Sequence, residues 1–320
     1  MTHLTSGSAA TRRPLDPDAA ISVRGLNKQF GTTKVLHDLD FDVPVGSITG
    51  LLGRNGAGKT TAMTLISGQD RPTSGEIRVF GADPYENPDA MAKLCFAREN
   101  QKYPESFRVS HVLGTAPWFF NAWDQELADM LAETFRLPTR TLVKKLSRGQ
   151  LSAVAIIVAL ASRSPLTFLD EPYLGLDATA RQLFYDVLLQ DHLAHPRTIL
   201  MSTHLIDEAS DLFEKILVIH DGKIVMDTTA EEAQAAAYSI AGPVAAVDAV
   251  VRPGTEVHRR RIGGLVSVTV EGRPDAAVRQ AAAQHRLEVG PVGLQELVAA
   301  LGTGSGGWLG PESTTHEEIG

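Results

Sequence analysis

The residues at positions 53–60, which read Gly-Arg-Asn-Gly-Ala-Gly-Lys-Thr, carry the clearest chemistry in the chain. They match the pattern G-x-x-x-x-G-K-[ST], in which glycines let the backbone bend so that successive N–H groups point at phosphate oxygens. Lys59 then reaches the β and γ phosphates as a point charge, and Thr60 offers its hydroxyl to magnesium. An apolar run precedes this P-loop pattern and a helix-like run follows it, which favours nucleotide binding over a glycine-rich turn before a helix. The predicted phosphate-binding residues are Gly53, Asn55, Gly56, Ala57, Gly58, Lys59, Thr60 and Thr61.

A pair of carboxylates, Asp170 and Glu171, ends a second apolar run at residues 166–171. At the end of a buried strand, Asp170 is placed to hold magnesium through water, as the acidic partner of a P-loop does. Glu171 then faces the γ phosphate and can take a proton from the attacking water. The alternative is a helix N-cap followed by an acid in the first turn, and Pro172 fits both interpretations. Together with the P-loop, the pair favours nucleotide hydrolysis.

Short stretches, in order along the chain, match one superfamily. They are Phe30 before Gly31, the P-loop at 53–60, Leu-Ser-Arg-Gly-Gln at 146–150, the Asp170-Glu171 strand, Leu-Gly-Leu-Asp at 174–177 and Ser-Thr-His at 202–204. Over residues 20 to about 235 the chain therefore resembles the nucleotide-binding subunit of an ABC transporter. The element at 146–150, called the signature below, is specific to this superfamily. The resemblance implies that the cofactors are ATP and Mg²⁺.

The resemblance also assigns nucleotide contacts outside the P-loop. It implies that Phe30 stacks on the adenine ring, although lone aromatic residues are more often core or turn residues. Ser147 and Gly149, at the start of a helix, are expected to bind the γ phosphate of an ATP held in another subunit's P-loop. Gln150 completes this part of the expected nucleotide site.

Two further residues receive roles from the resemblance. His204 is expected to contact the γ phosphate, hold the attacking geometry and act as a catalytic residue beside Glu171. A surface histidine is the alternative, but the position of His204 between an apolar strand and a helix favours the catalytic role. Asp177 is expected to lie at the subunit junction, where it links the two nucleotide sites.

One chain carries one P-loop and one signature, which in this family complete each other only across a two-fold interface. A monomer is therefore expected to bind ATP weakly and to hydrolyse it poorly. Dimerisation then becomes part of the catalytic mechanism, through a self-complementary interface if the partner is identical. The resemblance leaves open whether the partner is a second copy or a different ABC ATPase.

Three positions depart from the pattern of the family. Arg148 stands where the signature usually has a second glycine, which adds bulk and charge near the phosphates of the other subunit. Tyr173 replaces the small hydroxyl residue that commonly follows Glu-Pro. The loop that usually carries a magnesium-contacting, membrane-facing glutamine reads Phe-Ala-Arg-Glu-Asn-Gln at 96–101, so Glu99 and Gln101 both compete for this role. Counting back from residue 107 favours Glu99, whose carboxylate would ligate magnesium through water.

The aromatic run at 118–124, together with the leucine-rich helix after it, resembles bacterial exporters whose permease is a separate membrane protein. These aromatic side chains are expected to form a socket for a helix of that permease, with Trp118 the exposed one. The alternative is that they pack inside a small helical subdomain. An importer ATPase is the nearer rival function, and a cytosolic ABC ATPase that works on ribosomes or DNA is the more distant one.

An α/β fold is predicted from the order of the elements that must hold these residues. Strand patterns occur at 21–23, 35–43, 48–52, 75–80, 166–169, 198–201 and 216–219, and helix patterns at 127–135, 149–161, 178–193 and 206–213. Strands that alternate with helices predict a P-loop core with a mixed or parallel sheet, and the early alternating strand predicts an antiparallel β subdomain. Asp221-Gly222 predicts a hairpin after the last core strand.

The domain boundaries follow from changes in these patterns. The ATPase domain is expected at 19–238, with a helical subdomain at about 100–163. A small C-terminal α+β domain is expected at 240–302, with strands at 266–270 and 287–289 and helices at 275–285 and 294–301. The tails at 1–18 and 303–320 lack periodicity and are predicted to be disordered.

Composition restricts the class of protein further. The 320 residues are 43% apolar and 21% charged, which excludes a wholly disordered or fibrous chain. The single cysteine, Cys95, excludes an intrachain disulfide and fits a reducing compartment. The net charge of -8 argues against a nucleic-acid partner gripped through its phosphates. With no apolar run near the ~18 residues of a membrane span and no secretory signal, the expected location is peripheral, at the cytoplasmic face of the cell membrane.

Overall fold

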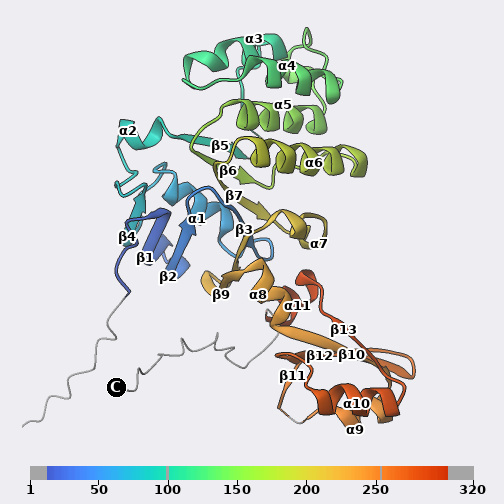
Figure 1. Cartoon of the computed structure of the whole chain (residues 1–320). Helices are drawn as coiled ribbons and strands as arrows, with labels where there is room; N and C mark the ends of the chain where they lie inside the picture. Colours follow the sequence, from blue (N-terminus) through green and yellow to red (C-terminus); the bar gives the residue numbers. More distant parts are fainter. Residues whose placement is uncertain (1–12, 99–100, 253, 302–320) are drawn as a thin grey trace, which may run out of the picture.

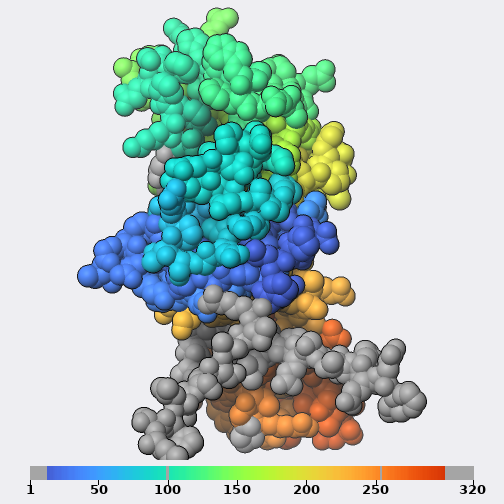
Figure 2. Space-filling model, turned by 90° about the vertical axis from the view of Figure 1, so that its left-hand side faces the viewer, coloured from blue at the N-terminus to red at the C-terminus, as the bar shows by residue number. Residues whose placement is uncertain are grey.

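The computed structural model describes residues 13–98, 101–252 and 254–301. Residues 1–12 and 302–320 hold most of the two predicted tails, and Glu99, the candidate magnesium ligand, also lies outside the described residues. The described part has three tiers along its length. A helical region lies at one end, the main sheets lie in the middle, and a small C-terminal unit lies at the other end (Figures 1 and 2).

Six strands form the central sheet, in the order β5-β6-β7-β3-β8-β9. Their bounds are β3 Ile48–Leu52, β5 Leu94–Arg98, β6 Leu166–Asp170, β7 Thr198–Thr203, β8 Lys215–His220 and β9 Lys223–Thr229. All neighbours up to β8 run parallel, and β9 returns antiparallel to β8 across Asp221-Gly222, as predicted. Every residue of β3, β6 and β7 is buried, because both faces of the sheet are covered. The predicted P-loop core with a mixed sheet is confirmed.

A smaller antiparallel sheet has the order β2-β1-β4. Its strands are β1 Ala19–Phe30, β2 Thr33–Pro44 and β4 Ser74–Val79. β1 is longer than the predicted 21–23 because polar residues within it find buried partners: Arg24 pairs with Asp42 at 2.8 Å and Ser22 Oγ donates to the same carboxylate at 2.7 Å. Arg24 Nε also donates to the carbonyls of Arg13 and Pro14, which holds the chain just before β1 against the sheet.

Helices cover both faces of the central sheet. Alternate residues of each strand belong to two separate core clusters, as Leu51 and Leu52 of β3 do. One cluster joins the sheet to α1 (Lys59–Ile66) and to the antiparallel sheet, and the other joins it to α5 (Arg148–Ala161) and α6 (Ala178–Ala194). No helix in the described ranges is both long and apolar enough to cross a membrane.

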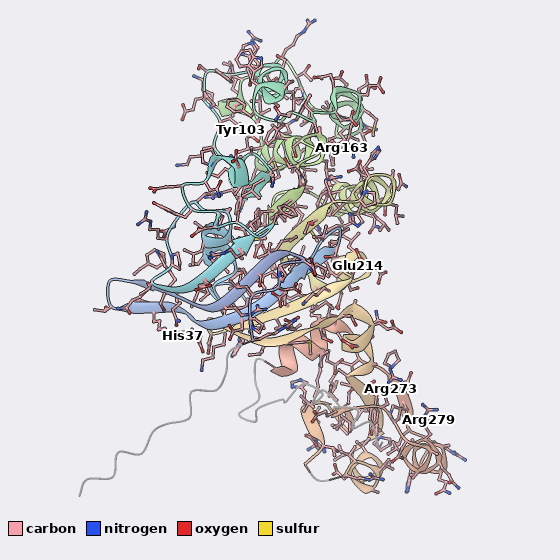
Figure 3. The ribbon with its side chains drawn as sticks, turned by 60° about the vertical axis from the view of Figure 1, so that its left-hand side comes forward. His37, Tyr103, Arg163, Glu214, Arg273 and Arg279 are labelled. Carbon is pink, nitrogen blue, oxygen red and sulfur yellow. The ribbon has the colours of Figure 1, made fainter. Side chains whose placement is uncertain are left out.

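The helical region contains α3 (Val109–Thr115) and α4 (Gln125–Thr134), which pack beside α5 (Figure 1). The short helix α2 (Pro88–Met91) precedes β5, and 3-10 turns occupy Ala116–Trp118 and Val143–Lys145. Arg163, labelled in Figure 3, follows α5 and pairs with Asp124 at 2.8 Å and with Asp191. Because Asp124 caps α4 and Asp191 lies on α6, this arginine ties the helical region to the core.

The C-terminal unit is a four-stranded antiparallel sheet with the order β11-β12-β10-β13. It contains β10 Ala237–Pro243, α9 Val244–Val250, β11 Glu256–Ile262, β12 Leu265–Glu271, α10 Ala276–Gln284 and β13 Glu288–Pro291, and α8 Ala230–Ala235 leads into it. α9 and α10 share one apolar cluster with the sheet, so both cover the same face of it. Figure 3 shows Arg273 and Arg279 in this unit, away from the central sheet.

The last helix, α11 (Leu294–Leu301), does not join the core of the C-terminal unit but packs on α7 (Ile206–Ala209). Its buried side chains belong to the large core cluster of the central sheet: Leu294, Leu297 and Val298. Asp207 of α7 accepts a hydrogen bond from the backbone N–H of Gln295 at 3.3 Å, which helps to cap α11. The helix predicted to complete the C-terminal domain therefore fastens that unit to the central sheet.

Candidate active site

The P-loop at 53–60 joins β3 to α1, so a buried strand leads directly into a helix N-terminus. Gly58 forms the N-cap of α1 with φ 110°, a conformation that L side chains rarely adopt. A Cβ at Gly58 would lie 2.6 Å from Leu36 Cδ2, so the loop closes tightly against β2. The N–H groups at the start of α1 and the helix dipole together favour an anion at this end.

One carboxylate connects the P-loop lysine to the histidine at the end of β7. Lys59 Nζ donates to the carbonyl of Gly53 at 2.9 Å and lies 3.3 Å from Glu171 Oε1. The other oxygen, Glu171 Oε2, lies 3.0 Å from His204 Nδ1. The side chains of Lys59 and Glu171 are largely buried. The structure therefore brings the predicted base, the predicted phosphate ligand and the predicted histidine into direct contact.

The backbone of Glu171 is strained. Its φ is 48°, which is uncommon for a residue other than glycine, aspartate or asparagine. The conformation is held by the Glu171 N–H, which donates to Ser202 Oγ at 3.1 Å on the adjacent strand β7. Strain of this kind persists where the surroundings over-determine it, and it turns the Glu171 side chain out of the strand toward Lys59 and His204.

Asp170 and Thr60 have the chemistry that Mg²⁺ prefers. Asp170 is buried, and Ser202 Oγ donates to its Oδ1 at 2.6 Å. Thr60 and Asp170 line one cleft together. Among the residues that the structure describes, no group of three or more His, Cys, Asp or Glu side chains is placed to hold a metal. A carboxylate and a hydroxyl leave most of an ion's shell to water and phosphate oxygens, which is how Mg²⁺ is usually bound.

A cleft of about 490 Å³ gathers most of the predicted site. The predicted residues that line it are Asn55, Gly56, Gly58, Lys59, Thr60, Thr61, Asp170, Glu171 and His204. Gly53 and Ala57 are buried and do not line the cleft. Val35, Arg148 and Leu174 also line the cleft and were not predicted to do so. Val35 comes from β2, and only the folding of the antiparallel sheet over the P-loop brings it there, so no local pattern marks it.

The signature begins α5 and lies outside this cleft except for Arg148. Ser147 caps the helix: its Oγ accepts from the Gln150 N–H at 3.2 Å, and the Gln150 side chain accepts from the Ser147 N–H at 3.0 Å. A Cβ on Gly149 would lie 2.4 Å from the carbonyl oxygen of Gly175. Glycine at 149 is therefore required by close packing against the loop after β6, a reason that the motif alone does not reveal.

Asp177 and Phe30 are not among the residues that the cleft brings together. Asp177 is exposed and caps α6, with its Oδ1 accepting from the Ala180 N–H at 2.8 Å. Phe30 ends β1 with 51% of its surface exposed, and Lys28 Nζ lies 4.8 Å from the centre of its ring. An exposed aromatic ring beside the P-loop sheet is compatible with base stacking, so this role stays a prediction.

A second, apolar cleft of about 530 Å³ lies between β5 and the helical region. Trp118 and Phe119 line it with 80% and 74% of their surfaces exposed, as predicted for Trp118. Phe120 also lines the cleft, but it stacks on Trp123, with ring centres 6.4 Å apart, and packs against the core. Gln101, the alternative to Glu99, also lines this cleft. Tyr103, labelled in Figure 3, marks its position beside the helical region.

Comparison with known proteins identifies the family. A sequence profile described as ABC transporter matches residues 36–174. Nod factor export ATP-binding protein I of Rhizobium leguminosarum bv. viciae is 34% identical over 214 residues, which cover 65% of this chain and 68% of that protein. The daunorubicin/doxorubicin resistance ATP-binding protein DrrA of Streptomyces peucetius is 31% identical over 222 residues, covering 68% of this chain and 67% of that protein. The chain belongs to the ABC transporter family of ATP-binding proteins.

Relatives within this family serve both directions of transport. The aliphatic sulfonates import ATP-binding protein SsuB 3 of Pseudomonas savastanoi pv. phaseolicola is 32% identical over 209 residues, covering 65% of this chain and 75% of that protein. A solved ATP-binding subunit of an ABC transporter is 25% identical, with a TM-score of 0.62, and covers 67% of this chain and 92% of its own. A dimeric ATP-binding cassette bound to ADP and Pi has the same fold, at 20% identity and a TM-score of 0.58, covering 66% of this chain and 98% of its own. The chain is thus an ABC-type ATPase and an ATP-binding motor subunit.

Proposed function

We propose that this ABC ATPase drives an exporter, as a dimer in which ATP is held between the P-loop of one subunit and the signature of the other. The observation that carries the proposal is the contact of Glu171 with both Lys59 and His204, at 3.3 Å and 3.0 Å, inside one cleft. A phosphate ligand, a base and a histidine at such distances are the parts that phosphoryl transfer to water requires.

The proposed chemistry assigns one task to each group. Glu171 accepts the proton of the attacking water, and Lys59 binds the β and γ phosphates once these compete with the carboxylate for its ammonium group. His204 donates a hydrogen bond to the γ phosphate. Mg²⁺, held by Thr60 and by Asp170 through water, would supply charge to neutralise the phosphate oxygens. Ser202 orients Asp170 by donating to it, so the metal site is built on two adjacent strands.

The dimer is supported by the position of the signature. Ser147 and Gly149 stand outside the cleft that holds the P-loop, at the exposed start of α5. The start of α5 carries the positive end of the helix dipole, which favours an anion supplied by another subunit. The related cassette bound to ADP and Pi is dimeric. In this chain we assign Ser147, Gly149 and Gln150 to the second subunit's nucleotide, and Asp177 to the junction between the subunits.

The proposed membrane partner is a separate permease that docks on the apolar cleft beside Trp118. Two large, exposed aromatic side chains that line an apolar cleft are suited to receive an amphipathic helix. The export direction is supported by relatives named for Nod factor export and for drug resistance. An importer ATPase is the second candidate, because the sulfonate import protein is equally similar. This partner would hold the chain at the cytoplasmic face of the membrane, and the net charge of -8 argues against nucleic acid as a partner.

The catalytic part of the proposal is tested with Glu171→Gln. Glutamine keeps the shape of the side chain but cannot accept the proton, so hydrolysis should fall by roughly 10²- to 10⁴-fold. ATP binding should persist, and the variant should form an ATP-dependent dimer visible by size-exclusion chromatography. If the variant stays monomeric with ATP, the proposed nucleotide site shared between two subunits is wrong. If it hydrolyses ATP at the wild-type rate, Glu171 is not the base.

The partner is tested with Trp118→Ala in membranes that contain the co-purifying permease. The variant should keep basal ATPase activity but lose permease-stimulated activity and binding. Leu193→Ala is the matched control, because Leu193 is comparably exposed at the end of α6, outside the lining of the cleft. Inside-out vesicles then give the direction, since an exporter accumulates cargo in them when ATP is added outside. Release of cargo from those vesicles would establish the importer instead.

A further inference from the structure

Tyr173 places a hydroxyl at the centre of a small network behind the catalytic histidine. Its side chain is 1% exposed. Thr203 Oγ1 donates to the Tyr173 hydroxyl at 2.8 Å, and the backbone N–H of His204 donates to it at 3.1 Å. A phenolic oxygen has two acceptor sites and one proton to donate. With both acceptor sites used, the proton is the remaining group that needs a partner.

His204 Nδ1 is the acceptor within reach of that proton, but it also faces Glu171. The nitrogen lies 3.0 Å from Glu171 Oε2 and 3.3 Å from the Tyr173 hydroxyl. An ionised carboxylate only accepts, so its contact requires a proton on Nδ1. The tyrosine can donate to Nδ1 only when that nitrogen carries no proton. In a neutral ring, the two contacts exclude each other, and each selects a different tautomer.

We propose that Tyr173 is a positioning residue that donates to His204 Nδ1 when Glu171 turns to the attacking water, and so fixes the tautomer protonated on Nε2. The Nε2–H group is then the donor that His204 presents to the γ phosphate. One proton leaves Nδ1 and another binds Nε2 through solvent, which reaches the ring because 33% of the His204 side chain is exposed. The inference rests on the proposed roles of Glu171 and His204 in hydrolysis.

Two features make this hydroxyl a dependable donor. Burial raises the pKa of Tyr173, and the nearby Glu171 carboxylate adds to the effect, so the phenol keeps its proton at neutral pH. The ring is held in the core and lies beside the rings of Tyr185 and His204, with ring centres 6.4 Å and 5.9 Å away. The small hydroxyl residue usual at this position carries its oxygen on Cβ, at the other end of the space that the ring fills.

A double-mutant cycle on the full chain tests the inference. Tyr173→Phe keeps the ring and removes the hydroxyl, and it should lower kcat by about 10- to 100-fold with little change in the KM for ATP. On a His204→Ala background the same change should have no further effect, because Tyr173 acts through that histidine. Tyr185→Phe is the matched control: its hydroxyl is buried without a hydrogen-bond partner among the described residues, so its removal should leave kcat unchanged.

The outcomes separate this inference from the proposed function. If Tyr173→Phe matches Tyr185→Phe in kcat, or multiplies the loss caused by His204→Ala, the positioning role is refuted. If Glu171→Gln and His204→Ala both hydrolyse ATP at the wild-type rate, the proposed catalytic roles fail whatever Tyr173 does.

A second measurement needs no tyrosine variant and so is independent of its folding. ¹⁵N chemical shifts of the His204 ring, assigned by comparison with His204→Ala, report the tautomer directly. The wild-type protein with Mg²⁺ and a non-hydrolysable ATP analogue should show the neutral ring protonated on Nε2. A ring that stays protonated on Nδ1 with the analogue bound would overturn the proposal.

Discussion

Gly149→Ala probes the contact that ties the signature to the rest of the site. A Cβ at this position would lie 2.4 Å from the carbonyl oxygen of Gly175, and real Cβ atoms essentially never approach another atom within 3.0 Å. The neighbouring atom is backbone, so it cannot turn away as a side chain can. The start of α5 and the loop before Asp177 must therefore move apart, by about 1 Å if an ordinary contact is to be restored.

The expected loss follows from that displacement. Misplacing a reacting or binding group by 1 Å costs about 10²-fold in rate, which corresponds to roughly 2.7 kcal/mol of transition-state stabilisation. Because Ser147 and Gly149 lie outside the cleft of their own chain, the loss should appear in dimer-dependent turnover. ATP binding to the isolated P-loop should change little. Steady-state ATPase activity at increasing protein concentration and fluorescent nucleotide binding measure the two quantities separately.

Gly114→Ala is the matched control for this prediction. Gly114 is also a helical glycine, in α3, and a Cβ there would meet nothing within 4 Å. Alanine in a helix is favoured over glycine by up to about 1 kcal/mol, so Gly114→Ala should raise the melting temperature and leave turnover unchanged. Wild-type turnover in Gly149→Ala would show that the loop yields without consequence, and the reasoning from close packing would be wrong.

Three further variants test other parts of the structure. Lys59→Ala should weaken ATP binding by roughly 10- to 100-fold, since a charge-assisted contact to phosphate is lost, and titration with a fluorescent nucleotide measures it. Leu297 is 3% exposed, so Leu297→Ala should destabilise the whole ATPase domain by about 2–5 kcal/mol in urea melts. Leu265 is 58% exposed, so Leu265→Ala, the control, should change the stability by less than about 0.5 kcal/mol. Burial alone would raise the pKa of Asp42, but hydrogen bonds from Arg24 and a nearby serine outweigh it and hold the pKa below 3.8. The stabilisation from this carboxylate is therefore full above about pH 4 and is lost as the pH falls through the pKa of Asp42 in the folded protein. Asp42→Asn should destabilise the protein by about 3–5 kcal/mol at pH 7. The variant should also lose less additional stability than the wild type when the pH is lowered.

The parts of the fold that could be predicted from the sequence are those whose physical cause is local. β3 and β6 are buried on both faces, and their unbroken apolar runs show it. The turn at Asp221-Gly222 needs a residue with positive φ at each position, and the observed values are 45° and 70°. The P-loop follows β3 directly, and the Asp170-Glu171 pair stands at the end of β6, so most of the cleft was predictable as well.

The parts that could not be predicted depend on partners far away in the chain. The amphipathic pattern of α11 shows that the helix buries one face, but not that this face packs on α7. The strand predicted at 21–23 continues past Arg24 in β1, because Asp42 on β2 pairs with this arginine and makes its burial favourable. The hydrogen bonds of the Tyr173 hydroxyl were equally unpredictable. The sequence shows only that a tyrosine stands where a small hydroxyl residue is usual, and the contact with His204 exists only once β6 and β7 lie side by side.

The packing of α11 affects how any truncation of the C-terminal unit must be read. α7 begins two residues after His204, and its residues Ile206 and Ala209 are buried in the same cluster as α11. Removal of α11 would expose this cluster next to the loop that carries His204, so a truncated chain should lose stability and ATPase activity together. Such a loss would not show that the unit senses a ligand or regulates turnover. A variant that alters the sheet of β10–β13 but keeps α11 packed on α7 is needed. It alone can distinguish regulation of turnover by the C-terminal unit from structural support of the loop that carries His204.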